Sequence, residues 1–406
     1  MNISMKLDRP LFGPTGGTRY LLVRIEAPRA ERGNTRAPLD VSLVLDRSGS
    51  MGGSKITLTQ RAARSTISLL SETDRCALVD YDNVVTRAVP VAKVDAVQRS
   101  RLIAAIDQLY ARANTNLFGG WLAGAEEIGG DVGARVKRVL LLTDGLANEG
   151  LTEHDQILHH VRELAVRGVA TTTFGVGADF DEHLVSGMAE AGGGHFYYVE
   201  RPEQIPDFLH SELGELLTVV ARQVKLSIAV NGPVRVYNLN DLPMDAGAFR
   251  LGDLSEGELV DLCFALEIAP DHAGPLGVAA VLEWMGTSSD IPTSSRAATD
   301  LSLATDQQVA NAPTDGAVIA EIVKIASASA RDDALRSNSR GDFDAARSRI
   351  NKAIDLVTML ERDYPEAAAE AAALRESLGS YSVAMPAMEA KRQKMASYEQ
   401  RRSRAR

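Results

Sequence analysis

A regular alternation of buried strands with amphipathic helices constrains the fold of this chain more than any other feature. The runs Val41–Leu45 and Val136–Thr143 are largely apolar, which is typical of strands that are covered on both faces. Residues 54–71 and 98–110 carry apolar side chains at helical spacing, and the same alternation continues to about residue 220. This order of elements predicts a mostly parallel α/β sheet with helices on both faces.

Polar side chains with oxygen atoms follow the predicted strands and one predicted loop. Asp46, Ser48 and Ser50 come directly after the first strand, Asp144 follows a later one, and Thr115 lies in a polar loop before a helix. Because right-handed crossovers bring the carboxyl ends of parallel strands to one edge, these side chains are expected to meet there. Carboxylates and hydroxyls are hard donors that suit Mg²⁺ or Mn²⁺ better than zinc or copper.

Three motifs in order resemble the metal-ion-dependent adhesion site (MIDAS) of the von Willebrand factor A family. They are Asp-Arg-Ser-Gly-Ser-Met at 46–51, Thr-Asn-Leu at 115–117 and Leu-Leu-Thr-Asp-Gly at 141–145. The resemblance spans roughly residues 38–217, and three motifs in order are specific where one Asp-x-Ser-x-Ser is not. It implies a doubly wound, Rossmann-like sheet with one antiparallel edge strand, for which the run at 84–91 is the candidate.

The resemblance also implies a role for each polar residue. The hydroxyls of Ser48, Ser50 and Thr115 are expected to bind the metal directly, while Asp46 and Asp144 lie close to it, directly or through water. The expected cation is Mg²⁺, with Mn²⁺ or Ca²⁺ as alternatives. Neutral ligands leave such a cation electron-poor and one position open, so a protein partner would supply an Asp or Glu to the metal.

The function expected from this site is a divalent-cation-dependent protein–protein interaction module, a scaffold or adaptor without enzymatic activity. One alternative is an accessory or client-recognition subunit of a MoxR-type AAA+ ATPase, because bacterial family members often accompany such ATPases. A weaker alternative is a Mg²⁺-dependent hydrolase that uses Asp46. It has little support, because position 48 is not a second Asp and the sequence shows no obvious lysine partner or nucleophile–His–acid set.

The rest of the chain predicts further parts around this domain. After Val220, strand-like runs without intervening helices indicate an antiparallel β-sandwich, and helical patterns return from about Gly316. The Thr/Ser-rich stretch 287–299 is expected to be a loop. The predicted organisation is an N-terminal segment at 1–37 whose strand pairs with the sandwich, the α/β domain at 38–220, the β-sandwich at 221–306, a helical region at 307–385 and a basic, disordered tail at 386–406.

Composition narrows the class of partner and the compartment. The 406 residues carry a net charge of −10, which argues against nucleic acid as a partner. Cys76 and Cys263 lie in apolar runs and read as buried thiols, not as a disulfide. No run approaches the roughly 18 apolar residues of a membrane helix, and the first residues do not resemble a signal peptide. A bacterial, cytoplasmic protein without membrane contact is therefore expected.

Overall fold

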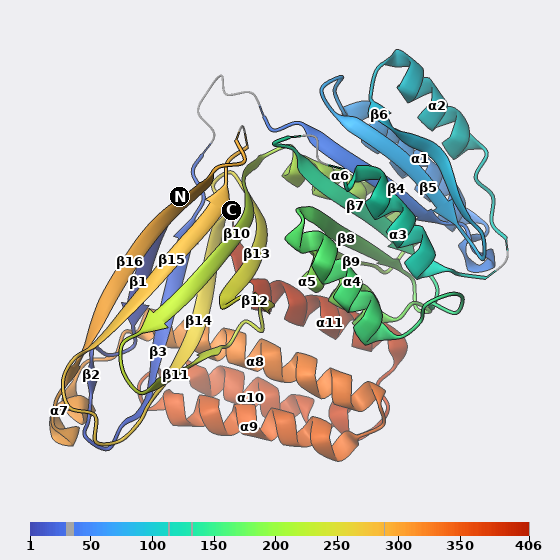
Figure 1. The fold of residues 1–406 in the computed structure, drawn as a ribbon. Helices are drawn as coiled ribbons and strands as arrows, with labels where there is room; N and C mark the ends of the chain where they lie inside the picture. The colour runs from blue at the N-terminus through green and yellow to red at the C-terminus, as the bar shows by residue number, and fades with distance from the viewer. Residues whose placement is uncertain (30–35, 113, 131–132, 288, 406) are drawn as a thin grey trace.

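The computed structural model describes residues 1–29, 36–112, 114–130, 133–287 and 289–405. Three parts contact one another: an α/β domain, a β-sandwich and a set of C-terminal helices that lies along both (Figure 1). The predicted fold class is thereby confirmed.

The α/β domain is built on a six-stranded sheet with the order β6-β5-β4-β7-β8-β9. All neighbours in it are parallel except β5 and β6, which form the one antiparallel pair at the edge. The strands are β4 (Leu39–Asp46), β5 (Arg75–Tyr81), β6 (Val85–Lys93), β7 (Val136–Thr143), β8 (Val169–Val176) and β9 (Gly193–Val199). The helices are α1 (Ser54–Leu69), α2 (Ala96–Asp107), α3 (Leu117–Ile128), α4 (His154–Val166), α5 (Glu182–Gly192) and α6 (Ile205–Leu216).

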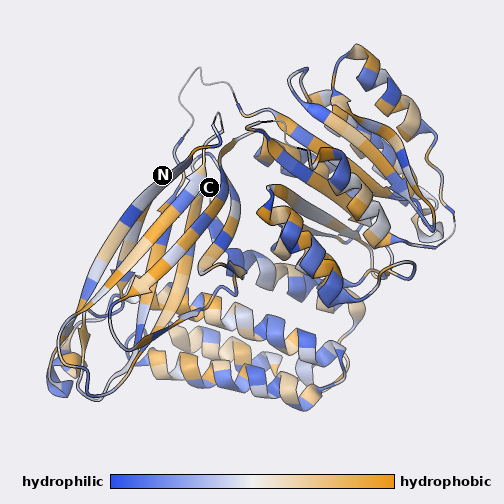
Figure 2. Cartoon of the chain, viewed as in Figure 1, coloured by the Kyte–Doolittle hydropathy of each residue, from blue (hydrophilic) through white to orange (hydrophobic). Residues whose placement is uncertain are grey.

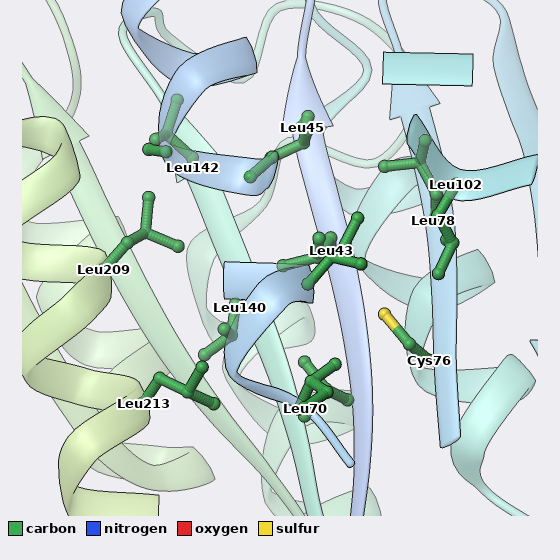
Figure 3. Close-up of a cluster of buried hydrophobic side chains, with 14 of the residues drawn as sticks. Leu43, Leu45, Leu70, Cys76, Leu78, Leu102, Leu140, Leu142, Leu209 and Leu213 are labelled. Carbon is green, nitrogen blue, oxygen red and sulfur yellow. The ribbon is translucent and has the colours of Figure 1, made fainter. Parts of the chain in front are cut away.

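Successive residues of the central strands enter two different cores. Leu43 and Leu140 lie in a cluster with α1, α2 and α6, whereas their neighbours Val44 and Leu141 lie in a cluster with α3, α4 and α5. Figure 3 shows the first of these clusters, with leucines of β4 and β7 meeting those of α6. Side chains of a strand point alternately to the two faces of its sheet, so β4 and β7 must be apolar throughout. Figure 2 shows these strands mostly in the hydrophobic colour.

Two sheets form the sandwich, and their neighbouring strands are antiparallel except β16 and β2, which pair in parallel. One sheet has the order β1-β3-β14-β11, with β17 (Arg404–Ala405) also paired to β14, and the other has the order β12-β13-β10-β15-β16-β2. The strands are β1 (Asn2–Leu7), β2 (Leu11–Phe12), β3 (Gly17–Glu26), β10 (Val219–Val230), β11 (Val234–Asn238), β12 (Met244–Asp245), β13 (Ala248–Ser255), β14 (Leu259–Ile268), β15 (Leu276–Met285) and β16 (Pro292–Leu303). β3 pairs with β14, so the α/β domain is inserted into the sandwich between β3 and β10.

The predicted loop at 287–299 is wrong over most of its length. β16 begins at Pro292 and pairs with β15 from Leu276–Leu301 to Met285–Pro292. Its Thr and Ser side chains are mainly exposed and alternate with half-buried ones, a pattern that an outer strand tolerates because one of its faces meets water. Counting hydroxyl residues identified the polarity of this segment but not its backbone pairing.

The longest of the C-terminal helices covers the outer face of the first sandwich sheet, and three others pack against it. The C-terminal helices are α7 (Asp306–Asn311), α8 (Gly316–Ser339), α9 (Phe343–Glu361), α10 (Ala367–Ser377), the short η3 (Ser380–Ser382) and α11 (Ala387–Arg402). Tyr20 and Leu22 of β3 point toward α8, whereas Leu21 and Val23 point into the sandwich core. β3 is therefore buried on both faces, one against strands and one against helices.

The predicted disordered tail at 386–406 is also wrong. Its residues form α11, which lies between the α/β domain and α8 (Figure 1). Lys394 is buried there with its ammonium nitrogen 2.6 Å from a carboxylate oxygen of Asp332 on α8. The basic residues of this segment find acidic partners on other elements, and a local charge count cannot detect such partners.

Two smaller predictions concern the thiols and the membrane. Cys76 and Cys263 are both free and buried, as expected. In the described part of the chain, no helix is long and apolar enough to cross a membrane.

Candidate metal centre

The carboxyl ends of two adjacent parallel strands place the acidic residues of the site. Asp46 is the last residue of β4, and Asp144 directly follows β7, which pairs with β4. Ser48 follows Asp46 by two residues, and Ser50 lies in the 3-10 helix η1 (Gly49–Met51) that opens α1. Because β4 and β7 are adjacent and parallel, the loops that follow them meet at one edge of the sheet, as expected from the sequence.

Asp46 is fully buried, and each of its carboxylate oxygens accepts a hydrogen bond. The backbone N–H of Ser48 donates to Oδ1 at 2.7 Å, and the hydroxyl of Thr143 donates to Oδ2 at 2.7 Å. Burial raises the pKa of Asp46 to about 6, and the nearby Asp144 carboxylate adds to this rise. A cation beside the carboxylate would act in the opposite direction.

The hydroxyls link the two carboxylates and the Thr115 loop into one cluster. Ser50 donates to Oδ1 of Asp144 at 2.6 Å, and its hydroxyl oxygen lies 3.1 Å from that of Ser48. A Cβ atom on Gly145 would lie 3.2 Å from Oγ1 of Thr115 and 3.7 Å from Oγ of Ser50, so both hydroxyls border this glycine. The structure thus brings all five predicted site residues, Asp46, Ser48, Ser50, Thr115 and Asp144, to one place.

Reciprocal hydrogen bonds fix the Thr115 loop against the loop that follows Asp144. The backbone N–H of Thr115 donates to Oδ1 of Asn148 at 2.9 Å, and the N–H of Asn148 donates to the carbonyl of Thr115 at 3.2 Å. Asn116 caps the start of α3 by accepting from the N–H of Gly119. These bonds hold Thr115 in a defined position, with its side chain buried beside the cluster.

Sequence reasoning missed three residues that contact the cluster: Lys55, Thr143 and Asn148. Lys55 forms an ion pair with Oδ2 of Asp144, whereas the sequence had shown no obvious lysine partner for the acidic residues. Its position in the first turn of α1, directly after the glycine-rich turn, was the available signal. Thr143 immediately precedes Asp144, and strand alternation directs it to the other side of the chain toward Asp46.

Comparison with known proteins identifies the fold that carries this cluster. Residues 40–211 match the model of the von Willebrand factor type A domain. This stretch is a von Willebrand factor type A (VWA) domain. It contains the five residues of the cluster as well as Lys55 and Thr143.

The curated relatives that this chain matches are longer than the chain. The protein YfbK of Escherichia coli (strain K12) is 28% identical over 265 residues, which cover 61% of this chain and 45% of YfbK. The protein sll0103 of Synechocystis is 30% identical over 193 residues, covering 47% of this chain and 44% of that protein. The chain thus spans less than half the length of these relatives.

Solved structures share the whole arrangement and not only the VWA domain. A von Willebrand factor type A protein from Catenulispora acidiphila superposes with a TM-score of 0.74 at 16% identity, covering 100% of this chain and 97% of that one. The ArnB paralog VWA2 from Sulfolobus acidocaldarius gives 0.63 at 16% identity, with 98% of each chain covered. At this identity the likeness concerns the fold alone.

A second cluster of potential ligands lies on β9 and α6 of the VWA domain. Nδ1 of His195 is 2.8 Å from Glu212 and 3.5 Å from Glu215. The buried Glu212 carboxylate also accepts hydrogen bonds from Arg138, Thr172 and Tyr197. Burial opposes its ionisation, but His195 and Arg138 hold the pKa of Glu212 below its usual range. With a guanidinium already on this carboxylate, the cluster is better explained as an internal hydrogen-bond network.

Proposed function

We propose that the VWA domain binds a divalent cation at the edge of β4 and β7 and uses it to hold a carboxylate of a protein partner. The observation that supports this most strongly is that the hydroxyls of Ser48 and Ser50 join the buried carboxylates, while the Thr115 hydroxyl borders the same glycine as Ser50. Ser48, Ser50 and Thr115 would bind the cation, with Asp46 and Asp144 close to it. The family resemblance implies the same roles for these residues.

The donor set fits Mg²⁺ or Mn²⁺ because all its candidate ligand atoms are hard oxygens. Neutral hydroxyls do not compensate the charge of a divalent ion, so it would supply an electrophilic position for an outside carboxylate. Gly145 supports this arrangement, because a side chain there would crowd the hydroxyls of Thr115 and Ser50. Ca²⁺ is the remaining candidate among hard cations.

We further propose that the site binds and does not catalyse. One carboxylate oxygen of Asp46 accepts a hydrogen bond from Ser48, and the other accepts one from Thr143. Because both oxygens are held in this way, Asp46 is better suited to anchor the site than to act as a nucleophile. Hydrolysis of generic phosphate and peptide substrates should therefore not rise above background on addition of Mg²⁺. Turnover that disappears in Asp46→Ala would contradict this proposal.

The partner is tested by comparing the wild type with Asp46→Ala and Ser50→Ala in affinity purification, with Mg²⁺ and with a chelator. Proteins retained only by the wild type in Mg²⁺ are the partners that the metal holds. Equal retention by all three proteins, or with chelator present, would contradict metal bridging. Retention of an AAA+ ATPase, followed by stimulation of its ATP hydrolysis, would favour the accessory-subunit function.

A further inference from the structure

Lys55 contacts the candidate metal centre without being one of its predicted ligands. Its ammonium group forms an ion pair with Oδ2 of Asp144, whose carboxylate is fully buried, while the lysine side chain is 21% exposed. The other oxygen of the same carboxylate, Oδ1, accepts from the hydroxyl of Ser50. Asp144 is therefore shared between the hydroxyl cluster on one side and a cation of the protein on the other.

The local backbone holds Lys55 in this position. Lys55 is the second residue of α1, and this helix directly follows the segment that carries Ser48 and Ser50. The start of the helix therefore places the lysine beside the same sheet edge as the two serines. On its other side is Gly177, where a Cβ atom would lie 3.8 Å from Nζ of Lys55. Gly177 has a φ of +77°, a conformation that favours glycine and keeps bulky side chains away from the ammonium group.

Counting the charges at this edge gives Lys55 a specific consequence. Asp46 and Asp144 together would neutralise a divalent cation, but Lys55 already cancels one of their two negative charges. With a divalent ion bound, the cluster would carry one excess positive charge in a largely buried setting. A single carboxylate from outside restores neutrality, and charge imbalance is costly where the dielectric constant is low.

We propose that Lys55 is a built-in counter-charge that weakens binding of the metal alone and couples it to binding of an acidic ligand. The metal and the partner's carboxylate would then bind cooperatively, because the bound metal leaves one excess positive charge and the carboxylate cancels it. This inference rests on the proposed metal site and deepens it: an acidic side chain is required by the charge of the site and not only by its open coordination position.

The test measures Mn²⁺ affinity by calorimetry and electron paramagnetic resonance on chelator-treated protein, for the wild type and Lys55→Met. Removing a positive charge near the ion is expected to tighten Mn²⁺ binding by about tenfold. Lys324→Met is the matched control, because it removes the same charge from an exposed pair with Glu321 on α8 and should leave Mn²⁺ affinity unchanged.

A second titration in saturating acetate, used as the carboxylate probe, measures the coupling. Acetate should tighten Mn²⁺ binding several-fold more in the wild type than in Lys55→Met. Lys55→Gln repeats the test if the methionine variant does not fold. A purely structural role predicts a lower melting temperature with unchanged Mn²⁺ affinity and coupling, and that result overturns the inference while leaving the metal site intact. Absence of Mn²⁺ binding in every variant overturns the metal site itself.

Discussion

Lys394 of α11 and Asp332 of α8 form an ion pair with both side chains 2% exposed and the nitrogen 2.6 Å from the oxygen. Arg401 of α11 also reaches Asp332, at 3.2 Å, and Arg336 of α8 reaches it at 3.0 Å. These contacts hold the pKa of Asp332 below its usual range, although burial alone would raise it. One carboxylate thus contacts three cations where α11 meets the helical region, and one of them, Arg401, also pairs with Glu190 and Asp241.

Asp332→Asn should therefore be severely destabilising. Removing this charge leaves the buried Lys394 without its acidic partner, which costs about 3–5 kcal/mol of unfolding free energy, whereas Arg401 keeps Glu190. Lys394→Met should cost less, because Asp332 keeps Arg401 and Arg336. Urea unfolding of both variants checks the order, and an equal loss in both would contradict the central role of Asp332.

The buried position of His183 leads us to expect that the protein loses stability on acidification below pH ~6.5. Both its ring nitrogens are buried without a hydrogen-bond partner. Burial lowers the pKa of His183, as does Lys394, against the opposing effect of Glu182, Asp181 and Asp332. The unfolded chain therefore takes up a proton before the folded protein does, so the free energy of unfolding falls as the pH drops below 6.5.

His183→Gln should reduce this pH dependence between pH 7.5 and 5.5 in thermal or urea unfolding, and the remainder is expected from His195, whose pKa is also lowered by burial. The matched control is His210→Gln, which removes an exposed imidazole from α6 and should keep the slope of the wild type. A slope that persists unchanged in His183→Gln would show that another group titrates in this range.

Thr115→Val tests the proposed metal site with almost no change in shape. At a Mg²⁺ concentration of a hundred times the dissociation constant, the wild type should gain about 2–3 kcal/mol of stability. The valine variant should lose most of this gain because it lacks the ligating hydroxyl. Thr59→Val is the control: its buried hydroxyl has no partner, so the variant should keep the full response to Mg²⁺.

Gly145→Ala should weaken metal binding by steric means. Its backbone does not have a positive φ, so alanine is compatible with the chain path, but the new methyl group would lie 3.2 Å from Oγ1 of Thr115. We expect at least a tenfold loss of Mn²⁺ affinity in calorimetry, on the order of 1.4 kcal/mol. Gly214→Ala in α6 meets no atom within 4 Å and should stabilise the helix by up to ~1 kcal/mol without changing Mn²⁺ affinity.

The sequence was informative where a local pattern determines the structure. The continuous apolar runs of β4 and β7 predicted strands covered on both faces, and the positions of Asp46 and Asp144 after them predicted where the acidic residues meet. The α/β order also predicted that the Thr115 loop lies at this edge, and the resemblance to the family supplied its expected role as a ligand. The position of Thr115 depends on Asn148, a contact across the fold that no spacing in the sequence reveals.

Features that depend on partners distant in the chain could not be predicted in the same way. The basic residues of α11 suggested a solvated end because their acidic partners Asp332 and Glu182 lie far away in sequence. The segment of β16 suggested a loop because many of its side chains are polar, and they are polar because one face of the strand is exposed. Its strand conformation depends on backbone pairing with β15, which its own composition does not reveal. The contact of Lys55 with Asp144 joins the start of a helix to the end of a strand from another βα unit.

The pairing of β3 with β14 has a consequence for how the protein is made. β3 leaves the ribosome before the VWA domain, yet its partner strand β14 follows only after the whole VWA domain has been translated. The VWA domain can fold as a unit during this interval, since domains generally fold as they emerge. Until β14 arrives, β3 can pair with β1 on one edge, but it carries apolar residues on both faces and one unpaired backbone edge, which makes nascent chains prone to aggregation. Truncated translation products that end before residue 259 should accordingly be the ones that chaperones retain.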